Sequence, residues 1–396
     1  MNPLRRTGVL IVSDALHVGG AERVSVDIAN TLDRDEFHVH YCATRVGGPL
    51  ERSLAPDVGL TVLGRAATWD LAKLWPFARL VQRKGIDVIH SHGRGTMKFV
   101  ALAKSLGLID TPHVFHDHFG WLHIDRGASW GLRTAMRRGV DAYIGVDQRL
   151  CEWARERIGM PADRVHLIRS GIDLARFDDA RPAGLRAQLR LGPDDVLLMM
   201  AANIRPQKDH PTLLRAMASL PDGLRARVHL AVAGSTDADS DYHAGCVDMI
   251  ERLGLEQQVH LLGERDDVPS LLAEADAAVL SSKNETGPLV ILEYMAAGVP
   301  FVATDTGEIA AAVRDLGVGF IVSPRDHHEF ADGLRRLLGL SVTERAEMGV
   351  NGRRIVAERF SQTLATEQVA ATYRAVLHQG ASVPATASPS SGPAAT

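Results

Sequence analysis

Cysteines, aromatic residues and long apolar runs are all scarce in this chain of 396 residues. Its three cysteines, Cys42, Cys151 and Cys246, stand far apart. Such usage suits a reducing cytosol and supplies neither a disulfide framework nor the ligand spacing of a zinc site. No apolar run approaches the roughly 20 residues that span a bilayer, and neither a Gly-x-Gly-x-x-Gly fingerprint nor a Walker-type phosphate loop occurs. These absences argue against a disulfide-stabilised scaffold, a membrane-spanning protein and a hydride-transfer enzyme.

The charged residues are divided unevenly along the chain. The formal net charge is -4, but residues 1–170 contain 23 Lys and Arg against 18 Asp and Glu, which leaves 21 against 30 for the remainder. Basic residues are densest in segments 69–84 and 126–138, where they mix with Trp at helical spacing. Such helices can lie on an anionic membrane, although solvated helices with a packed Trp are commoner. No nucleic-acid-binding motif accompanies the charge, so we expect no nucleic acid partner.

Apolar strand-like runs alternate with amphipathic helical patterns along the whole chain, which predicts an α/β protein with doubly wound parallel sheets. The expected strands lie near residues 9–13, 38–44, 60–63, 88–91, 113–116, 143–146, 165–168, 196–201, 228–233, 259–262, 277–280, 301–304 and 320–322. Without an internal repeat, the two series predict two facing Rossmann-like domains, at residues 1–172 and 173–360. A helix over 361–378 should pack back toward the first domain. The Gly-, Ala-, Ser- and Pro-rich residues 379–396 predict a disordered tail.

The most informative segment contains two glutamates, Glu285 and Glu293, separated by seven residues at a strand-to-helix transition. Residues 277–282 are typical of a buried strand, Pro288 suits the first turn of a helix and Gly298 can end it. Glu285 would then lie in the loop before the helix, and Glu293 one turn inside it.

The start of that helix is a candidate anion site. The N–H groups of Leu289 and Val290 would have no partner within the helix, so they could bind a phosphate. One glutamate could then bind sugar hydroxyls on one side of the phosphate and the other a ribose on the far side. This layout suits a nucleotide sugar. The alternative is an amphipathic helix with two solvated glutamates.

The run from Glu285 to Thr304 resembles the signature of the retaining glycosyltransferases of family four, which have the GT-B fold of two facing Rossmann-like domains. With the companion motifs, the resemblance extends over roughly residues 8–378. Two positions in and near these motifs depart from the family pattern, in addition to one described below: Thr286 stands where the family usually has Gly, and Ser170 where it usually has Asn. The segment from Gly171 to Phe177 otherwise resembles the residues that precede the family's interdomain linker.

In each expected domain, one further motif follows the first strand. Gly19 and Gly20 open a helix that should run to about Leu32, and two residues without side chains allow close approach to a phosphate or sugar. A tight turn is the alternative, but the position resembles the family's Gly-Gly-x-Glu loop. In the second domain, Arg205 and Lys208 are cations placed to neutralise a diphosphate.

The family usually has an Arg five residues before that Lys, where this chain has Asn203. The resemblance therefore implies diphosphate binding by Lys208, with Arg205 as a substitute displaced by two residues. The alternative is a pair of ordinary surface cations. Gly263 to Leu272 resembles the family segment beside the nucleotide base, and Arg265 lies within it.

A histidine-rich stretch contains the remaining candidate. His116 resembles the family histidine that faces the donor sugar from the end of a first-domain strand. The neighbouring polar residues could suggest zinc, but no zinc-ligand pattern is present, so we expect a water-exposed loop and no metal; they are His113, Asp117, His118 and His123. Asp237 to Asp241 likewise fails the calcium-loop pattern, since Tyr242 stands at its required Gly, and is expected to be a solvated loop.

The resemblance implies a metal-independent, retaining sugar transfer from a nucleotide sugar, with no cofactor. The expected mechanism is a front-face displacement, in which the leaving diphosphate helps to deprotonate the acceptor hydroxyl. The implied catalytic residues are His116, Arg205, Lys208 and Glu285. The implied donor-binding residues are Gly19, Gly20, Asn203, Arg205, Lys208, Gly234, Arg265, Glu285, Gly287, Pro288, Leu289, Val290 and Glu293.

The expected partners are a UDP- or GDP-sugar donor and a carbohydrate or lipid-linked acceptor, as in surface polysaccharide or glycolipid assembly. We expect a cytoplasmic enzyme, with peripheral attachment to the inner face of a membrane as a candidate. Two alternatives remain open at this point. One is a nucleotide-sugar epimerase of similar fold, and the other is a non-catalytic homologue that binds sugar nucleotides.

Overall fold

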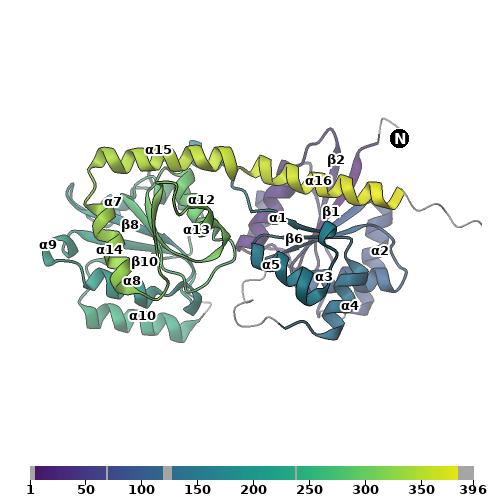
Figure 1. The fold of residues 1–396 in the computed structure, drawn as a ribbon, viewed down its shortest axis with the longest axis horizontal. Coiled ribbons are helices and arrows are strands. Elements are labelled where there is room, and N and C mark those ends of the chain that lie inside the picture. Colours follow the sequence, from purple (N-terminus) through teal and green to yellow (C-terminus); the bar gives the residue numbers. More distant parts are fainter. Residues whose placement is uncertain (1–4, 68–69, 119–126, 237–238, 382–396) are drawn as a thin grey trace, which may run out of the picture.

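The computed structural model describes residues 5–67, 70–118, 127–236 and 239–381. Two α/β lobes lie side by side, the first from the N-terminal half of the chain and the second from the C-terminal half (Figure 1). Each lobe contains one parallel sheet with helices on both faces. This is the doubly wound arrangement expected from apolar strands that alternate with helices.

The first sheet has seven strands in the order β3-β2-β1-β4-β5-β6-β7. Its strands are β1 Thr7–Ser13, β2 Phe37–Ala43, β3 Gly59–Val62, β4 Val88–His92, β5 His113–Asp117, β6 Ala142–Gly145 and β7 Val165–Leu167. The helices between them are α1 Gly20–Thr31, α2 Leu74–Arg83, α3 Arg94–Ser105, α4 Trp130–Gly139 and α5 Gln148–Trp153. The strand order changes direction between β1 and β4, so the loops that follow these two strands diverge at the edge where ligands of such folds bind.

The second sheet has six strands in the order β10-β9-β8-β11-β12-β13. Its strands are β8 Val196–Ala201, β9 Val228–Ala233, β10 Val259–Gly263, β11 Ala277–Leu280, β12 Phe301–Thr304 and β13 Gly319–Val322. The helices up to its last strand are α6 Ala175–Asp178, α7 Leu185–Gln188, α8 His210–Ala218, α9 Asp222–Arg225, α10 Ser240–Leu253, α11 Val268–Leu272, α12 Leu289–Ala296 and α13 Gly307–Val313. The order changes direction between β8 and β11, which carry the loops with Lys208 and Glu285.

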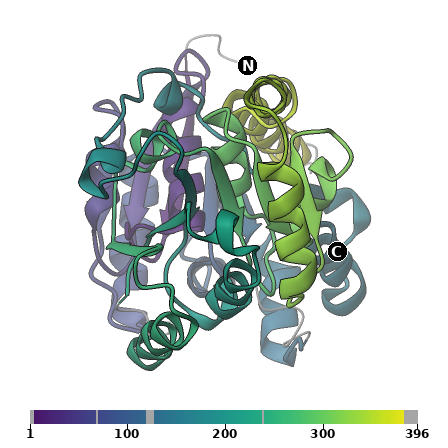
Figure 2. The same ribbon diagram turned by 90° about the vertical axis from the view of Figure 1, so that its left-hand side faces the viewer.

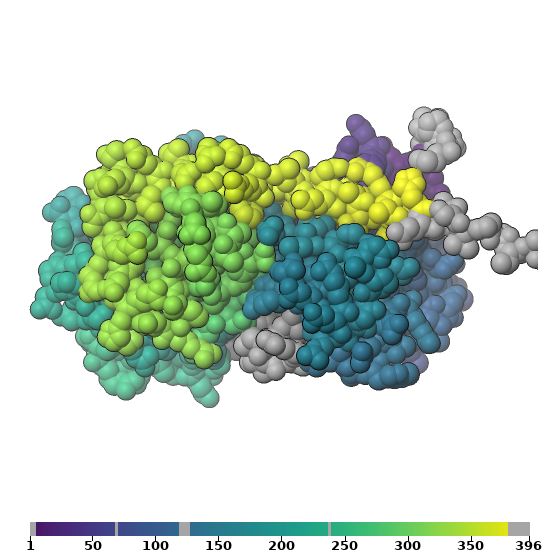
Figure 3. Space-filling view, viewed as in Figure 1, coloured from purple at the N-terminus to yellow at the C-terminus, as the bar shows by residue number. Residues whose placement is uncertain are grey.

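Three helices complete the chain: α14 His327–Leu338, α15 Val342–Arg359 and α16 Gln362–Ala381. Figure 2 places the second domain in front and shows helices flanking its sheet. In Figure 3, α15 and α16 form a band along one edge of the molecule, from the second lobe to the first. Val369, Ala370, Tyr373 and Val376 of α16 are buried in the core of the first domain.

The chain crosses between the lobes twice, and the two crossings touch. Ile172 and Ser361 form a parallel bridge, in which the Ile172 amide donates to Phe360 O at 2.8 Å and the Gln362 amide donates to Ile172 O at 2.9 Å. A Cβ atom at Gly171 would lie 2.6 Å from Ser361 O. Only glycine therefore allows the crossings to approach this closely.

All thirteen expected strands are present among the described residues, and their ends differ from expectation by at most two residues. The expected α/β fold with two parallel sheets is therefore confirmed. One boundary is wrong, because α16 continues to Ala381 beyond the predicted end at residue 378. Composition alone placed the start of the tail at Gln379, but Gln is a good helix former, so the helix continues to Ala381 despite a cost of about 1 kcal/mol at Gly380.

Candidate functional site

The loops that follow β8 and β11 are hydrogen-bonded to each other at the carboxyl edge of the second sheet. The Gln207 side chain donates to Asn284 O at 2.8 Å, the Lys283 amide donates to Gln207 O at 2.8 Å, and the Ser281 hydroxyl donates to Lys208 O at 2.9 Å. Backbone and side-chain bonds thus fix the two loops as one unit. This unit positions the sequence-predicted cation and carboxylate against each other.

Lys208 and Glu285 form an ion pair in which Lys208 Nζ lies 2.6 Å from Glu285 Oε1. The Ser282 hydroxyl donates to the same oxygen at 2.8 Å. The side chains of Lys208 and Glu285 are only 13% and 12% exposed. Charge-assisted bonds in such a shielded place are strong and orient both groups.

Helix α12 begins beside this pair, at Leu289, with Pro288 at the position before the first helical residue. A hydrogen bond from the Glu308 amide to Thr286 O, at 2.7 Å, holds the loop before α12 in place. Gly307 has φ +79°, and a Cβ atom there would lie 2.8 Å from Thr286 O. The positive φ and the lack of room for a Cβ atom both require glycine at position 307. The first-turn amides of α12 have no partner within the helix, so they can bind an anion.

Glu293 lies one turn into α12 and faces the first domain. Its carboxylate is 3.8 Å from the Arg176 guanidinium, which belongs to the linker. Burial raises the pKa of Glu293, and Arg176 and Arg23 oppose this rise. Burial also raises the pKa of Asp27 on α1 to about 6, although the nearby Arg23 and Arg176 lower it. Charged groups of both domains and the linker therefore meet around Glu293.

The first domain contacts the loop and helix start from the opposite side. A Cβ atom at Gly20 would lie 3.8 Å from Leu289 Cδ1, so Gly20 faces the beginning of α12. Gly19 precedes the first residue of α1, and a Cβ atom there would meet the side chain of Glu22 within its own helix. Helix α1 begins at Gly20 and ends at Thr31, close to the expected range.

Four residues that sequence reasoning missed also join the domains here. Arg149 Nη2 donates to Glu285 O at 2.7 Å while its guanidinium pairs with Asp147. Arg169 donates to Glu308 Oε1 at 2.6 and 3.0 Å, and the Gln148 amide donates to Glu308 Oε2 at 3.2 Å. None of these residues lies in a motif. Each bonds to a residue of the other domain that is far away in the sequence. Only the packed structure reveals them.

Other predicted donor-site residues occupy different surroundings. Arg205 is exposed, and its guanidinium forms no hydrogen bond or ion pair among the described residues, so it is available to a ligand. Asn203 Oδ1 accepts from the Ser235 amide at 2.9 Å and ties the loop after β8 to the loop after β9. A Cβ atom at Gly234 would lie 2.1 Å from Ala202 O, so only glycine fits. Arg265 is paired with Asp267, two residues further on.

His116 lies at the end of β5 and is 1% exposed. The expected water-exposed loop is wrong here, because His113 and His116 belong to a strand between β4 and β6, and both are buried. Burial and the neighbouring histidines hold the pKa of His116 well below its usual value, so the imidazole is neutral. The structure shows no contact between His116 and the Lys208–Glu285 pair among the residues it describes. His123 lies outside them.

The other sequence segments are placed as follows. Asp239 accepts a hydrogen bond from the Tyr242 amide at 3.0 Å and caps α10, so the expected solvated loop ends at a helix start there. Asp237 is outside the described residues.

In the basic segments, Trp75 on α2 is 59% exposed and Trp130 on α4 is 82% exposed. Trp69 and Arg126 are outside the described residues. No described helix is long and apolar enough to cross a membrane.

Comparison with known proteins assigns both domains. Residues 18–176 match the model of Glycosyltransferase Family 4, and residues 184–355 match that of Glycosyl transferases group 1. A D-inositol 3-phosphate glycosyltransferase of Saccharomonospora viridis is 30% identical over 352 residues, which cover 87% of this chain and 76% of the relative. The enzyme of the same name from Mycobacterium bovis is 31% identical over 73% of this chain and 61% of its own length.

Solved structures show the same fold. A glycosyltransferase from Rickettsia africae superposes with a TM-score of 0.80 at 17% identity and covers 94% of this chain and 99% of its own. HepE of Anabaena in complex with UDP-glucose gives a TM-score of 0.78 at 24% identity, over 93% of this chain and 100% of its own. The chain therefore belongs to the family-four glycosyltransferases. It is a retaining, nucleotide-sugar-dependent glycosyltransferase with the GT-B fold.

Proposed function

We propose that the Lys208–Glu285 pair, together with the start of α12, is the donor-binding centre of this glycosyltransferase. The observation that carries the proposal is the 2.6 Å contact between Lys208 Nζ and Glu285 Oε1, because it places a cation and a carboxylate together beside free helix amides. A nucleotide sugar needs this combination. The cation and amides bind its diphosphate, and the carboxylate accepts hydrogen bonds from its sugar.

The neighbouring residues complete the assignment. Arg205 supplements Lys208 at the diphosphate, with the backbone N–H groups of Gly287, Leu289 and Val290, while Glu293 accepts hydrogen bonds from the ribose. Asn203 and Gly234 shape the loops behind the diphosphate, and Arg265 lies on the base side. His116 faces the donor sugar from the first domain, where its neutral imidazole can accept or donate a hydrogen bond.

The reaction follows from these positions. As the bond between the anomeric carbon and the diphosphate oxygen breaks, negative charge grows on the leaving diphosphate, where Lys208, Arg205 and the helix amides stabilise it. The acceptor oxygen attacks from the same face and forms the new glycosidic bond. The acceptor proton passes to the leaving phosphate oxygen. No metal is required in this scheme, since the cations and amides carry the positive charge.

The acceptor belongs to the first domain in this proposal, and the pathway is surface polysaccharide or glycolipid assembly. A basic surface on α4 supports it. Trp130, Arg133, Arg137 and Arg138 line a hollow of about 540 Å³. Exposed Trp beside arginines is suited to the interface of an anionic membrane that holds a lipid-linked acceptor. The enzyme would then act at the cytoplasmic face.

A donor and acceptor panel tests the proposal. UDP- and GDP-sugars are incubated with the chain, and nucleoside diphosphate release is measured with lipid-linked glycans, with soluble glycans and with D-inositol 3-phosphate, the compound in the names of the relatives. We expect release from one donor class that depends on an acceptor and is lost in Lys208→Ala. Release that is unchanged in a folded Lys208→Ala variant would overturn the assignment. Stimulation by D-inositol 3-phosphate alone would replace the lipid-linked acceptor by a soluble one.

A further inference from the structure

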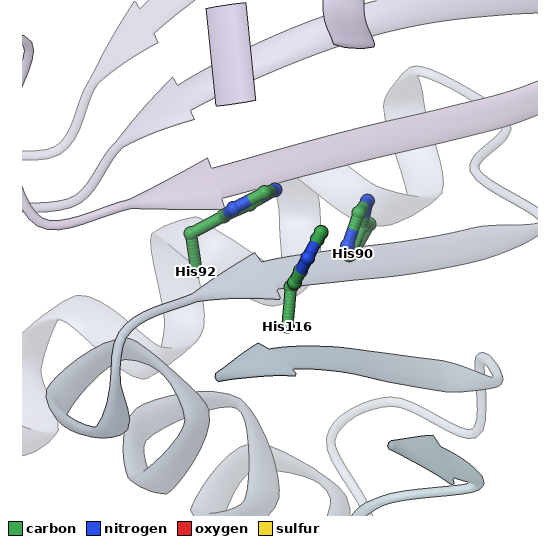
Figure 4. A group of neighbouring side chains, drawn as sticks. All are labelled: His90, His92 and His116. Atoms are coloured by element: carbon green, nitrogen blue, oxygen red, sulfur yellow. The ribbon is translucent and has the colours of Figure 1, made fainter. Parts of the chain in front are cut away.

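Three imidazoles converge on one face of the first sheet. His90 and His92 are two residues apart on β4, so both project to the same side, and His116 is the register partner of His92 on β5. One ring nitrogen from each of the three lies within 4.8 Å of the other two. Figure 4 shows the ring of His116 between those of His90 and His92 in that view.

Two ring nitrogens of this group are already bonded. His90 Nδ1 lies 2.6 Å from the hydroxyl of Tyr373, a buried residue of α16. His92 Nδ1 lies 3.1 Å from His118 Nε2. These contacts leave the Nε2 atoms of His90 and His92 as the remaining ring nitrogens.

The other ring nitrogens of the three histidines are without partners. His90, His92 and His116 are 0%, 4% and 1% exposed, and none of His90 Nε2, His92 Nε2 and the two ring nitrogens of His116 has a hydrogen-bond partner among the described residues. Buried polar atoms are nearly always bonded in folded proteins, so this group needs an explanation. Stacking of the rings, with centroids 4.4–5.4 Å apart, accounts for the packing but satisfies none of these atoms.

We propose that His90, His92 and His116 form a binding site for a late first-row divalent cation, with zinc as the best fit. Neutral imidazole nitrogens are the ligands that zinc, copper and nickel prefer, whereas magnesium and calcium require oxygen ligands. Tyr373 and His118 contact the Nδ1 atoms of His90 and His92. A hydrogen bond to the nitrogen that does not bind the metal is what orients histidines at metal sites. The fourth position of a tetrahedral ion is left for water.

The geometry requires a small adjustment. Zinc–nitrogen bonds of about 2.0–2.1 Å at tetrahedral angles hold ligand nitrogens roughly 3.4 Å apart. The three nitrogens lie within 4.8 Å of one another, so ring rotations that close these gaps by roughly 1 Å complete the site. The buried acid on the same strand does not compete, because Asp117 is bonded to Arg94 and Tyr143.

This site has a consequence for catalysis that rests on the proposed function of His116. Zinc would occupy one of the two ring nitrogens of His116 and fix the orientation of its ring, so the ion should inhibit sugar transfer instead of supporting it. Metal binding itself does not depend on that role. The two statements can therefore fail separately.

Cobalt(II) is the probe for binding, because its tetrahedral complexes absorb strongly in the visible range. The full chain is treated with chelator, freed of it, and titrated with Co²⁺. We expect tetrahedral bands that saturate at one equivalent and disappear when Zn²⁺ is added. His92→Gln and His116→Gln should each weaken Co²⁺ binding at least tenfold. Absence of the bands in the wild type, or their persistence in both variants, would overturn the site.

Two further variants make the test specific. His229→Gln/His260→Gln removes the histidine pair of the second domain, whose facing nitrogens are 3.2 Å apart, and should leave the bands unchanged. Their loss in this control would place the metal elsewhere. Tyr373→Phe keeps the aromatic ring but removes the hydroxyl that holds His90. It should weaken Co²⁺ binding about tenfold, as for other groups that orient metal ligands, even if the histidine variants fail to fold.

The activity arm separates the site from the role of His116. Nucleoside diphosphate release by the chelator-treated enzyme should continue undiminished, and Zn²⁺ should then inhibit it with the midpoint at which it displaces Co²⁺. Binding without inhibition would leave the metal site in place and remove His116 from the reaction. Active enzyme that binds no Co²⁺ would overturn the metal site and leave the proposed function standing.

Discussion

The two sheets differ in where they keep their polar side chains. In the described part of the chain, a single apolar cluster surrounds the second sheet, and its four central strands contain no buried polar residue before Thr304 at the end of β12. The first domain divides its apolar residues among three clusters. Between them, His90, Ser91, His92, His113 and His116 lie buried within β4 and β5.

This difference separates two ways to build a site. The second domain is a rigid apolar scaffold whose chemistry lies in the loops after its strands, where Lys208 and Glu285 meet. The first domain brings polar groups into the sheet itself, where they must be satisfied by one another or by a ligand.

The largest effect is expected at the donor loops. Lys208→Ala removes the cation that we propose stabilises the leaving diphosphate, so turnover should fall by about two orders of magnitude or more. Lys283→Ala is the matched control, because Lys283 lies in the same pair of loops but pairs with Asp209 at 3.3 Å. Its turnover should stay close to that of the wild type. Equal losses in the two variants would mean that loop structure, not charge at the diphosphate, is responsible.

The next effect separates the two glutamates. Glu293→Gln should weaken binding of bare UDP or GDP about tenfold, because the carboxylate that we propose accepts hydrogen bonds from the ribose becomes a neutral amide. Glu285→Gln should keep or increase that affinity, because Lys208 is freed from its 2.6 Å partner, while turnover of the nucleotide sugar falls about tenfold to a hundredfold. Calorimetry with the bare nucleotides and steady-state kinetics measure the two quantities. A similar loss of nucleotide affinity in both variants would show that the roles are misassigned.

The fold was predictable because buried parallel strands are short apolar runs bounded by turn residues, as in Ala277–Leu280. The motifs suggested Lys208 and Glu285 as candidate donor residues, but their contact was not predictable, since it depends on bonds between two loops far apart in sequence. The group of His90, His92 and His116 was not predicted, because the first two residues interrupt an apolar strand. Only the strand period of two, applied to β4 together with its neighbour β5, places these rings together.

Cross-domain contacts had no sequence signal at all. Glu308 is an ordinary first-turn acid in α13, where a helix favours negative charge for local reasons. Its partner Arg169 follows the last strand of the other domain. No periodicity or spacing connects the two residues, so the pair emerges only when both domains are packed.

The basic surface on α4 offers a smaller effect that is confined to the first domain. Replacing Arg133, Arg137 and Arg138 by Gln should weaken sedimentation with anionic vesicles about tenfold at low salt, since each cation near such a surface contributes about 1 kcal/mol and exposed side chains realise only part of it. Donor hydrolysis should not change. Raising the salt should reduce wild-type binding in the same direction.

The control for that surface lies in the other domain. Arg335 and Arg354 are paired, exposed arginines of α14 and α15, and changing both to Gln should leave vesicle binding unaltered. Failure of the wild type to sediment with anionic vesicles at low salt would remove the membrane from the proposal and favour a soluble acceptor. Equal losses from the two sets of substitutions would indicate only a response to net charge.

The smallest effect is expected where the domains meet. Glu308→Gln weakens the ion pair with Arg169, whose side chain is 43% exposed, so solvent limits its worth to under about 1 kcal/mol. The pair favours the arrangement in which Gly20 lies against Leu289, and its loss should raise the apparent KM for the donor about two- to fivefold, with less change in kcat. High salt should produce the same shift in the wild type but little further change in the variant. Arg314→Gln, which breaks the ion pair with Asp305 inside the second domain, serves as the control and should leave KM unchanged. A rise in KM in the control, with none in Glu308→Gln, would show that charge within the second domain, not the contact between domains, sets donor affinity.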